Sequence, residues 1–113
     1  MKYKISKIHP NGIIALLTLI FVPVFWKSPL FLTLILAILS MIMLINLKSR
    51  SYYVLYILCF ILGTVSESVA IYYGAWSYSM SNFAGIPYWL PFVWGIIGIF
   101  IKRLSLQIEK IYK

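Results

Sequence analysis

Glu67 is the residue of this chain whose type and position could support chemistry. It lies in an apolar stretch, Tyr52 to Trp76, that contains no Lys, Arg or Asp, and Glu109 is the only other acidic residue. Such a stretch is long enough to cross a bilayer, where an ionisable group usually has a partner or a task. Ser66 and Ser68 flank the carboxyl and could donate hydrogen bonds to it.

The chemistry open to such a carboxyl depends on its neighbours in the membrane. No Lys or Arg is available at this depth, so we expect the acid to be neutral or to exchange protons. It could relay protons, act as a catalytic acid, or bind a cationic or hydroxylated ligand. The structural alternative is a protonated Glu67 that joins two helices and has no further role.

Small residues share the predicted helix face of Glu67. Gly63, Ala70 and Gly74 stand at helical spacing from it, and at about 100° per residue all four fall within roughly 60° of one another. Small residues mark the places where membrane helices approach closely. We therefore expect Glu67 to face another helix or an internal cavity.

A second stripe follows on the next apolar segment. Pro87, Pro91, Trp94 and Gly98 repeat the spacing 0, 4, 7 and 11. Counted from the outer ends of two antiparallel helices, Trp94 and Glu67 both lie roughly 12–14 Å deep at about 1.5 Å per residue. Because an indole N–H is only a donor, we predict a hydrogen bond from Trp94 to the Glu67 carboxyl.

Aromatic residues are concentrated on the expected outer side, beside the Glu67 face. A belt of Trp and Tyr at the membrane interface is one interpretation. An aromatic-lined cavity for an apolar or cationic ligand is the other. The candidate ligand-binding residues are Trp94, Trp76, Tyr72, Tyr73, Tyr78, Trp89 and Ser66, with Phe83 and Tyr88 nearby.

Four apolar runs must position these residues. They cover about 12–26, 29–47, 52–76 and 86–101, and none shows the alternation of a membrane strand. We therefore expect an all-α membrane protein with four transmembrane helices. The first and fourth are short for about 30 Å of hydrocarbon, and Pro23 should kink or end the first.

Positive charges distinguish four spans from three. With four spans, nine of the ten Lys and Arg residues fall on one side and only Lys27 on the other. The positive-inside rule then predicts both termini in the cytoplasm and a single integral domain, 1–113, in the cell membrane. The basic tail, 102–113, should extend the last helix and attract anionic lipid.

Composition excludes several classes of protein and site. With 63% hydrophobic and 11% charged residues, a soluble domain would lack the polar surface to cover its core. The net charge of +8 lies at the ends of apolar runs, so we expect no nucleic-acid partner. One cysteine, Cys59, and one histidine, His9, predict neither an intrachain disulfide nor a metal site, and we expect no cofactor.

The lysine-rich start resembles a signal peptide, but no cleavage site follows, so we interpret it as a retained first span.

A family resemblance rests on three short segments: Glu67 with Gly74-Ala-Trp76-Ser-Tyr78, then Gly85-Ile86-Pro87, then Leu90-Pro91-Phe-Val-Trp94-Gly. Here the chain resembles the carotenoid-modifying membrane families, the lycopene cyclase small subunits and the bisanhydrobacterioruberin hydratases. The resemblance implies binding of, or acid chemistry on, a polyene, with Glu67 as the proton donor. Cyclase-type proteins carry an acidic pair after the proline, whereas Phe92 and Val93 follow Pro91 here.

Two further classes of function stay open, and so does whether the protein is an enzyme. Its layout is similar to that of the small multidrug resistance transporters, which work as dimers, although their glutamate belongs to the first helix. That layout would permit proton-coupled efflux. The class we favour packs against a membrane-protein partner or a second copy, or binds a lipid or isoprenoid near Glu67.

Overall fold

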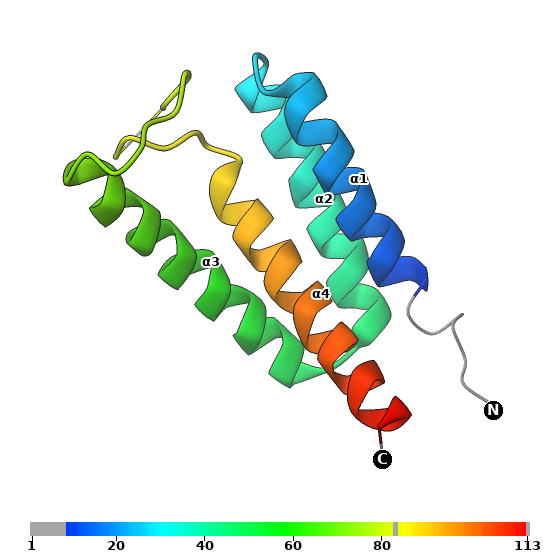
Figure 1. Ribbon diagram of the computed structural model, residues 1–113. Helices are drawn as coiled ribbons and strands as arrows, with labels where there is room; N and C mark the ends of the chain where they lie inside the picture. The colour runs from blue at the N-terminus through cyan, green and yellow to red at the C-terminus, as the bar shows by residue number, and fades with distance from the viewer. Residues whose placement is uncertain (1–8, 83, 113) are drawn as a thin grey trace.

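The computed structural model describes residues 9–82 and 84–112 as a bundle of four helices (Figure 1). The helices α1 (His9–Phe25), α2 (Pro29–Leu47), α3 (Arg50–Tyr72) and α4 (Leu90–Ile111) alternate in direction. The start of α1, the turn between α2 and α3, and the end of α4 lie at one end of the bundle. The α1–α2 turn and the loop 73–89 lie at the other. The predicted all-helical fold is confirmed, and the described ranges contain four helices as expected.

The surface of the bundle suits contact with lipid. The helices α2, α3 and α4 are long and apolar enough to cross a membrane, and α1 has a shorter apolar segment, Gly12–Phe25. Pro23 lies inside α1, two residues before its end. Large hydrophobic side chains stay exposed along both α2 and α3, where a water-soluble bundle would present polar ones. Examples are Leu34, Met41, Ile45, Ile57, Leu62 and Val69.

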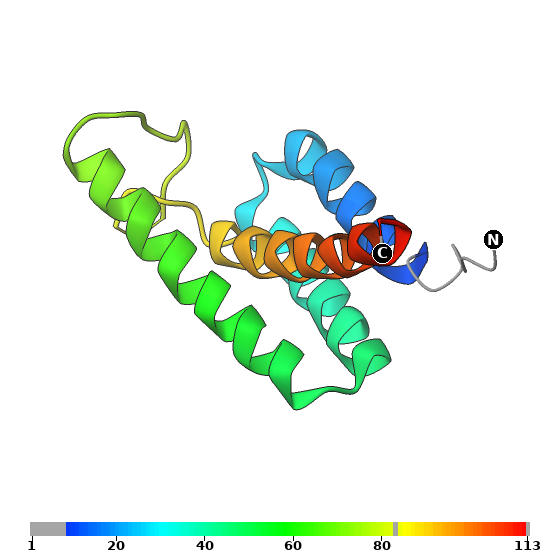
Figure 2. The same ribbon diagram turned by 60° about the horizontal axis from the view of Figure 1, so that its bottom comes forward.

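The helix α4 occupies the centre of the bundle. It packs against each of the other three helices, with α3 on one side and α1 and α2 on the other (Figure 2). Its buried residues Ile96 and Ile99 belong to the same core as Leu32, Leu36 and Met43 of α2. The Arg103 guanidinium lies 3.5 Å from the Tyr52 hydroxyl, which places this part of α4 level with the start of α3.

Glycines set the close approach of α3 and α4. A Cβ on Gly63 would lie 2.1 Å from the Trp94 ring, and one on Gly95 would lie 2.5 Å from the Tyr56 ring. A Cβ on Gly98 would lie 2.4 Å from the Cys59 sulfur. All three distances are too short for non-bonded carbon atoms, so only glycine permits this packing. The expectation that small residues mark the helix contact is confirmed at Gly63 and Gly98.

The end of α3 differs from the prediction. The helix ends at Tyr72 and not at residue 76, because Gly74 adopts a left-handed backbone with φ of +85°. The Ala75 N–H donates to the Ala70 carbonyl at 2.9 Å, and the Gly74 N–H donates to the Ile71 carbonyl at 3.0 Å. This pair of bonds is the Schellman motif, which commonly ends helices at a glycine. The prediction that Gly74 belongs to the helix face of Glu67 is therefore wrong.

The start of α4 also differs, whereas its end extends as expected. The helix begins at Leu90 and not at residue 86, with Pro91 in its first turn, where a missing N–H is tolerated. Pro87 is buried but precedes the helix, so it does not belong to the stripe predicted with Trp94. The helix continues to Ile111, which confirms that the basic tail extends the last helix.

Candidate functional site at Glu67

The Glu67 carboxyl accepts three hydrogen bonds from aromatic side chains. Its Oε1 accepts from the Trp76 indole N–H at 3.0 Å and from the Tyr78 hydroxyl at 2.6 Å. Its Oε2 accepts from the Trp94 indole N–H at 2.9 Å, which confirms the hydrogen bond predicted from the sequence. One oxygen thus binds the loop after α3, and the other binds α4.

Two local features of the sequence bring these donors to Glu67. The Schellman turn at Gly74 reverses the chain about two helical turns beyond Glu67, so Trp76 and Tyr78 fold back over the end of α3. The missing side chain at Gly63 leaves room for the Trp94 ring, whose N–H then reaches Glu67 one helical turn further along α3. Both features depend on glycine.

The site lies nearer the loop 73–89 than predicted. Glu67 is five residues before Tyr72, which is about 8 Å along the helix axis. Trp94 is four residues after Leu90, which is about 6 Å. The predicted distance of 12–14 Å was counted from residues 76 and 86, which lie in the loop, so the distance to the helix end is shorter. The prediction that the two side chains lie at the same level is confirmed by their hydrogen bond.

The donors around Glu67 are neutral. No ion pair to its carboxyl occurs within residues 9–82 and 84–112. The cation at this end of the bundle, Lys27, lies 5.4 Å from the ring centroid of its neighbour Trp26. Partial burial, together with the hydrogen bond to Glu67 and its negative charge, raises the pKa of the Tyr78 phenol well above its ordinary value. Tyr78 therefore stays protonated and keeps donating at neutral pH.

An apolar groove adjoins the carboxyl. It has a volume of about 190 Å³ and is lined by Glu67 together with Leu90, Val93, Trp94 and Ile97. The Trp94 side chain is 37% exposed and Trp76 is 50% exposed, so the site opens to the surroundings of the bundle. The predicted contact of Glu67 with another helix is confirmed, but Glu67 is only partly buried.

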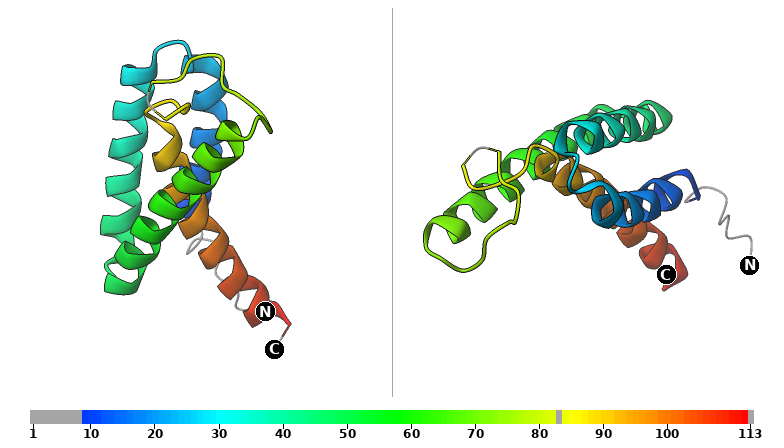
Figure 3. Two further views of the ribbon diagram at one scale, coloured as in Figure 1. Left: turned by 90° about the vertical axis from the view of Figure 1, so that its left-hand side faces the viewer. Right: turned by 90° about the horizontal axis from the view of Figure 1, so that it is seen from above.

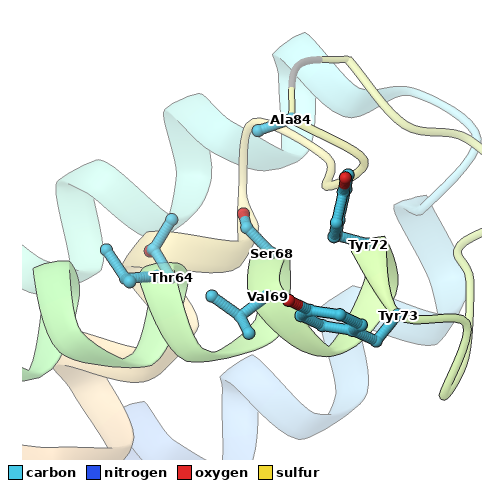
Figure 4. Close-up of a pocket in the computed structure, with 7 residues that line it drawn as sticks. Thr64, Ser68, Val69, Tyr72, Tyr73 and Ala84 are labelled. Carbon is cyan, nitrogen blue, oxygen red and sulfur yellow. The ribbon is translucent and has the colours of Figure 1, made fainter.

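Tyr72 and Tyr73 do not join this site. Tyr72 is 82% exposed and its ring meets that of Tyr73 edge to face, with centroids 5.1 Å apart. Both line a separate groove of about 560 Å³ on another face of α3, together with Thr64, Val65, Ser68, Val69 and Ala84 (Figure 4). At about 100° per residue, Tyr72 points roughly 140° away from Glu67. The candidate aromatic residues therefore do not all share one face.

The remaining candidate residues support the site indirectly or lie apart from it. Trp89 is buried, and its ring packs edge to face against Tyr78 with centroids 6.3 Å apart. Its indole N–H has no acceptor among the residues that the structure describes. Ser66 is exposed, and across the described chain neither it nor Ser68 donates to the carboxyl. Phe83 and the three N-terminal lysines lie outside the described residues, as does the side chain of His9.

Sequence reasoning missed part of this arrangement. Trp76 and Tyr78 were expected to contact a ligand, not to bind Glu67, and the signal for their true place was the helix-ending Gly74. The groove residues Leu90, Val93 and Ile97 were not singled out, although they share one helical face with Trp94. In the described residues, no group of three or more His, Cys, Asp or Glu side chains could hold a metal ion.

Comparison with known proteins gives no relative from which a function could be transferred. No family model, curated protein or solved structure matches the chain. The resemblance to carotenoid-modifying proteins therefore stays a prediction, and the functional argument rests on the geometry around Glu67.

Proposed function

We propose that this protein is a four-span membrane protein, with both ends on the cytoplasmic side, that binds a lipid or isoprenoid at Glu67. The distribution of charge supports this topology. Lys48, Arg50, Lys102, Arg103 and Lys110 lie at the end of the bundle where α1 starts and α4 ends, and Lys27 lies at the other. Cytoplasmic loops carry such an excess of positive charge.

The single observation that carries the proposed binding function is the groove beside the carboxyl. Its lining residues from Leu90 to Ile97 run about 10 Å along α4, away from the outer end and toward the membrane centre. A head group that donates to Glu67 would therefore lie near the outer boundary, with its hydrocarbon chain along the groove. The groove is smaller than the roughly 300–1,000 Å³ of sites that enclose a whole ligand. It would hold the head and the first part of the chain, and lipid would surround the rest.

The test is binding of farnesol to the protein in a neutral maltoside detergent, measured by native mass spectrometry. We expect saturable binding of one farnesol per chain. The Ile97→Phe variant narrows the groove and should abolish it. Ile61→Phe changes an exposed side chain of α3 by the same volume and should leave binding unchanged. Equal binding by the two variants would show only partition into the detergent belt and would overturn the proposal.

Transport and acid catalysis are two other functions that would use the Glu67 carboxyl. Placement of Glu67 near one end of the helices, with neutral donors only, favours binding over a proton path across the bundle. Liposomes that contain the protein can be tested for proton-driven uptake of ethidium. Uptake that Glu67→Gln abolishes would show that the function is transport and not binding. Co-purification of a stoichiometric polypeptide in place of lipid would instead make it an accessory subunit.

A further inference from the structure

We infer that the ligand of the Glu67 site carries a protonated amine head group with at least one N–H. This inference rests on the proposed binding function and names the class of its ligand. Three features of the described residues support it: the acceptor capacity left on the carboxyl, the absence of a neutralising cation, and the indole rings beside it.

The carboxyl has one acceptor position to spare. A carboxylate offers about four lone-pair positions, two on each oxygen. Trp76 and Tyr78 use both positions of Oε1, whereas Trp94 alone donates to Oε2. Trp94 lines the groove and the two Oε1 donors do not. The spare position is therefore on the oxygen bound to the groove-lining residue, where a ligand head group can reach it.

The negative charge of an ionised Glu67 favours a cationic ligand. Within the described residues the carboxyl has three neutral donors and no Lys, Arg or His in an ion pair with it. With the carboxyl ionised, an alcohol could fill the spare position, but a protonated amine would form a charge-assisted hydrogen bond, which is roughly twice as strong. A carboxylate or phosphate head would be repelled. Among head groups that can donate, the amine therefore matches the site best.

The indole rings favour the same choice. Trp76 and Trp94 point their N–H edges at Glu67, and about half of the Trp76 surface and a third of the Trp94 surface stay exposed. The face of an indole ring attracts a cation within about 6 Å. A quaternary ammonium would gain from the rings and the charge but could not donate to Oε2. We therefore expect binding to rank primary amine, then quaternary ammonium, then alcohol, then carboxylate.

The experiment compares four probes with one hydrocarbon tail on the unmodified protein. Farnesylamine, trimethylfarnesylammonium, farnesol and farnesoic acid are titrated at pH 7 in the maltoside detergent and followed by native mass spectrometry. We expect farnesylamine to bind at least tenfold more tightly than farnesol, and farnesoic acid to bind most weakly. Equal affinities would overturn the amine inference while leaving the binding function intact. Failure of all four to bind at a saturable site would overturn the binding function itself.

A matched pair of variants tests whether Glu67 is the source of the preference. Glu67→Gln should reduce the amine-to-alcohol ratio to about one, whereas Glu109→Gln, at the exposed far end of α4, should keep it. An amine preference that persists in Glu67→Gln would place the recognition elsewhere and overturn the inference. If Glu67→Gln does not fold, Ile97→Phe tests the place of binding, because it should abolish farnesylamine binding while leaving the carboxyl in place. Unchanged farnesylamine binding by Ile97→Phe would overturn the inference.

Discussion

The contact between α3 and α4 has two halves: an outer half near the loop 73–89 and an inner half near the α2–α3 turn. Both halves use glycine, but for different purposes. In the inner half, Gly95 and Gly98 bring the helices together until the Tyr56 ring and the Cys59 sulfur fill the space between them. In the outer half, Gly63 makes room for the Trp94 indole, which ends on the Glu67 carboxyl. The inner contact is filled by the Tyr56 and Cys59 side chains, whereas the outer contact ends at the Glu67 carboxyl and the groove beside it.

Their different surroundings explain this contrast. The helices α2 and α3 lie close together near their connecting turn and diverge toward the opposite end (Figure 3). The inner half of α3 therefore contacts α2, and Tyr56 donates to Ser40 of α2 at 2.5 Å in a buried pair of neutral hydroxyls. The outer half has no such cover, so the loop 73–89 supplies the donors for its polar group. The buried polar pair at Tyr56 is neutral, whereas the polar group under the loop, Glu67, is ionisable.

The largest expected effect on stability comes from adding a methyl group to the inner contact between α3 and α4. Gly95→Ala would place a methyl group against the Tyr56 ring, and overpacking of this kind destabilises by about 3 kcal/mol. Thermal unfolding in detergent, followed by circular dichroism, measures the change. Gly12→Ala is the control, because its new methyl would meet Phe100 at 4.0 Å, an ordinary contact. Equal stability of the two variants would mean that the inner half is not tightly packed.

Trp94→Phe should loosen the outer contact. It removes the donor to Oε2, and a hydrogen bond to a charged group contributes about 1.5–3 kcal/mol, so we expect a loss near the lower figure. The carboxyl stretching band in infrared difference spectra should shift as well. Trp89→Phe is the control, since its N–H has no acceptor among the described residues and its loss should leave the band in place. Identical bands in the wild type and Trp94→Phe would contradict the hydrogen bond.

Tyr56→Phe removes the hydrogen bond between the neutral hydroxyls of Tyr56 and Ser40 in the inner half. Hydrogen bonds between membrane helices contribute about 0.6 kcal/mol on average, so the effect should be smaller than that of Trp94→Phe. Tyr53→Phe, at an exposed position of the same helix, should change nothing measurable. The comparison between the halves would reverse if Tyr56→Phe proved more costly than Trp94→Phe.

The smallest effect concerns alkaline pH. The pKa of Tyr78 is raised in the folded protein, whereas the unfolded chain should release this proton near pH 10, so folding holds the proton more tightly. Tyr78 therefore stabilises the fold fully below about pH 10, and this stabilisation is lost as pH rises beyond it. Unfolding measured from pH 9 to 11.5 should show a shallower decline for Tyr78→Phe than for the wild type. Tyr72→Phe, at an exposed position, should keep the wild-type slope.

The sequence predicted the helices better than the connections between them. Composition and apolar runs predicted four helices, with α2 found at its expected bounds, because lipid-facing helices must be apolar over their whole length. Matching depths on two antiparallel helices predicted the Trp94–Glu67 bond, which rests on helical geometry alone. The loop could not be predicted in the same way. Its path depends on one left-handed glycine and on tertiary contacts of Trp76 and Tyr78, and apolar periodicity records neither.

Gly74 shapes the site through its backbone conformation and not through contacts of a side chain. Apart from Gly74 and its two chain neighbours, no atom of the described residues lies within 4 Å of where a side chain at Gly74 would begin. Space does not restrict this position, but handedness does, because an L-residue at φ of +85° is strained by about 1–2 kcal/mol. A D-alanine introduced by chemical synthesis would fit where L-alanine would not. The donors on Oε1 therefore depend on the absence of an L side chain at a single α-carbon.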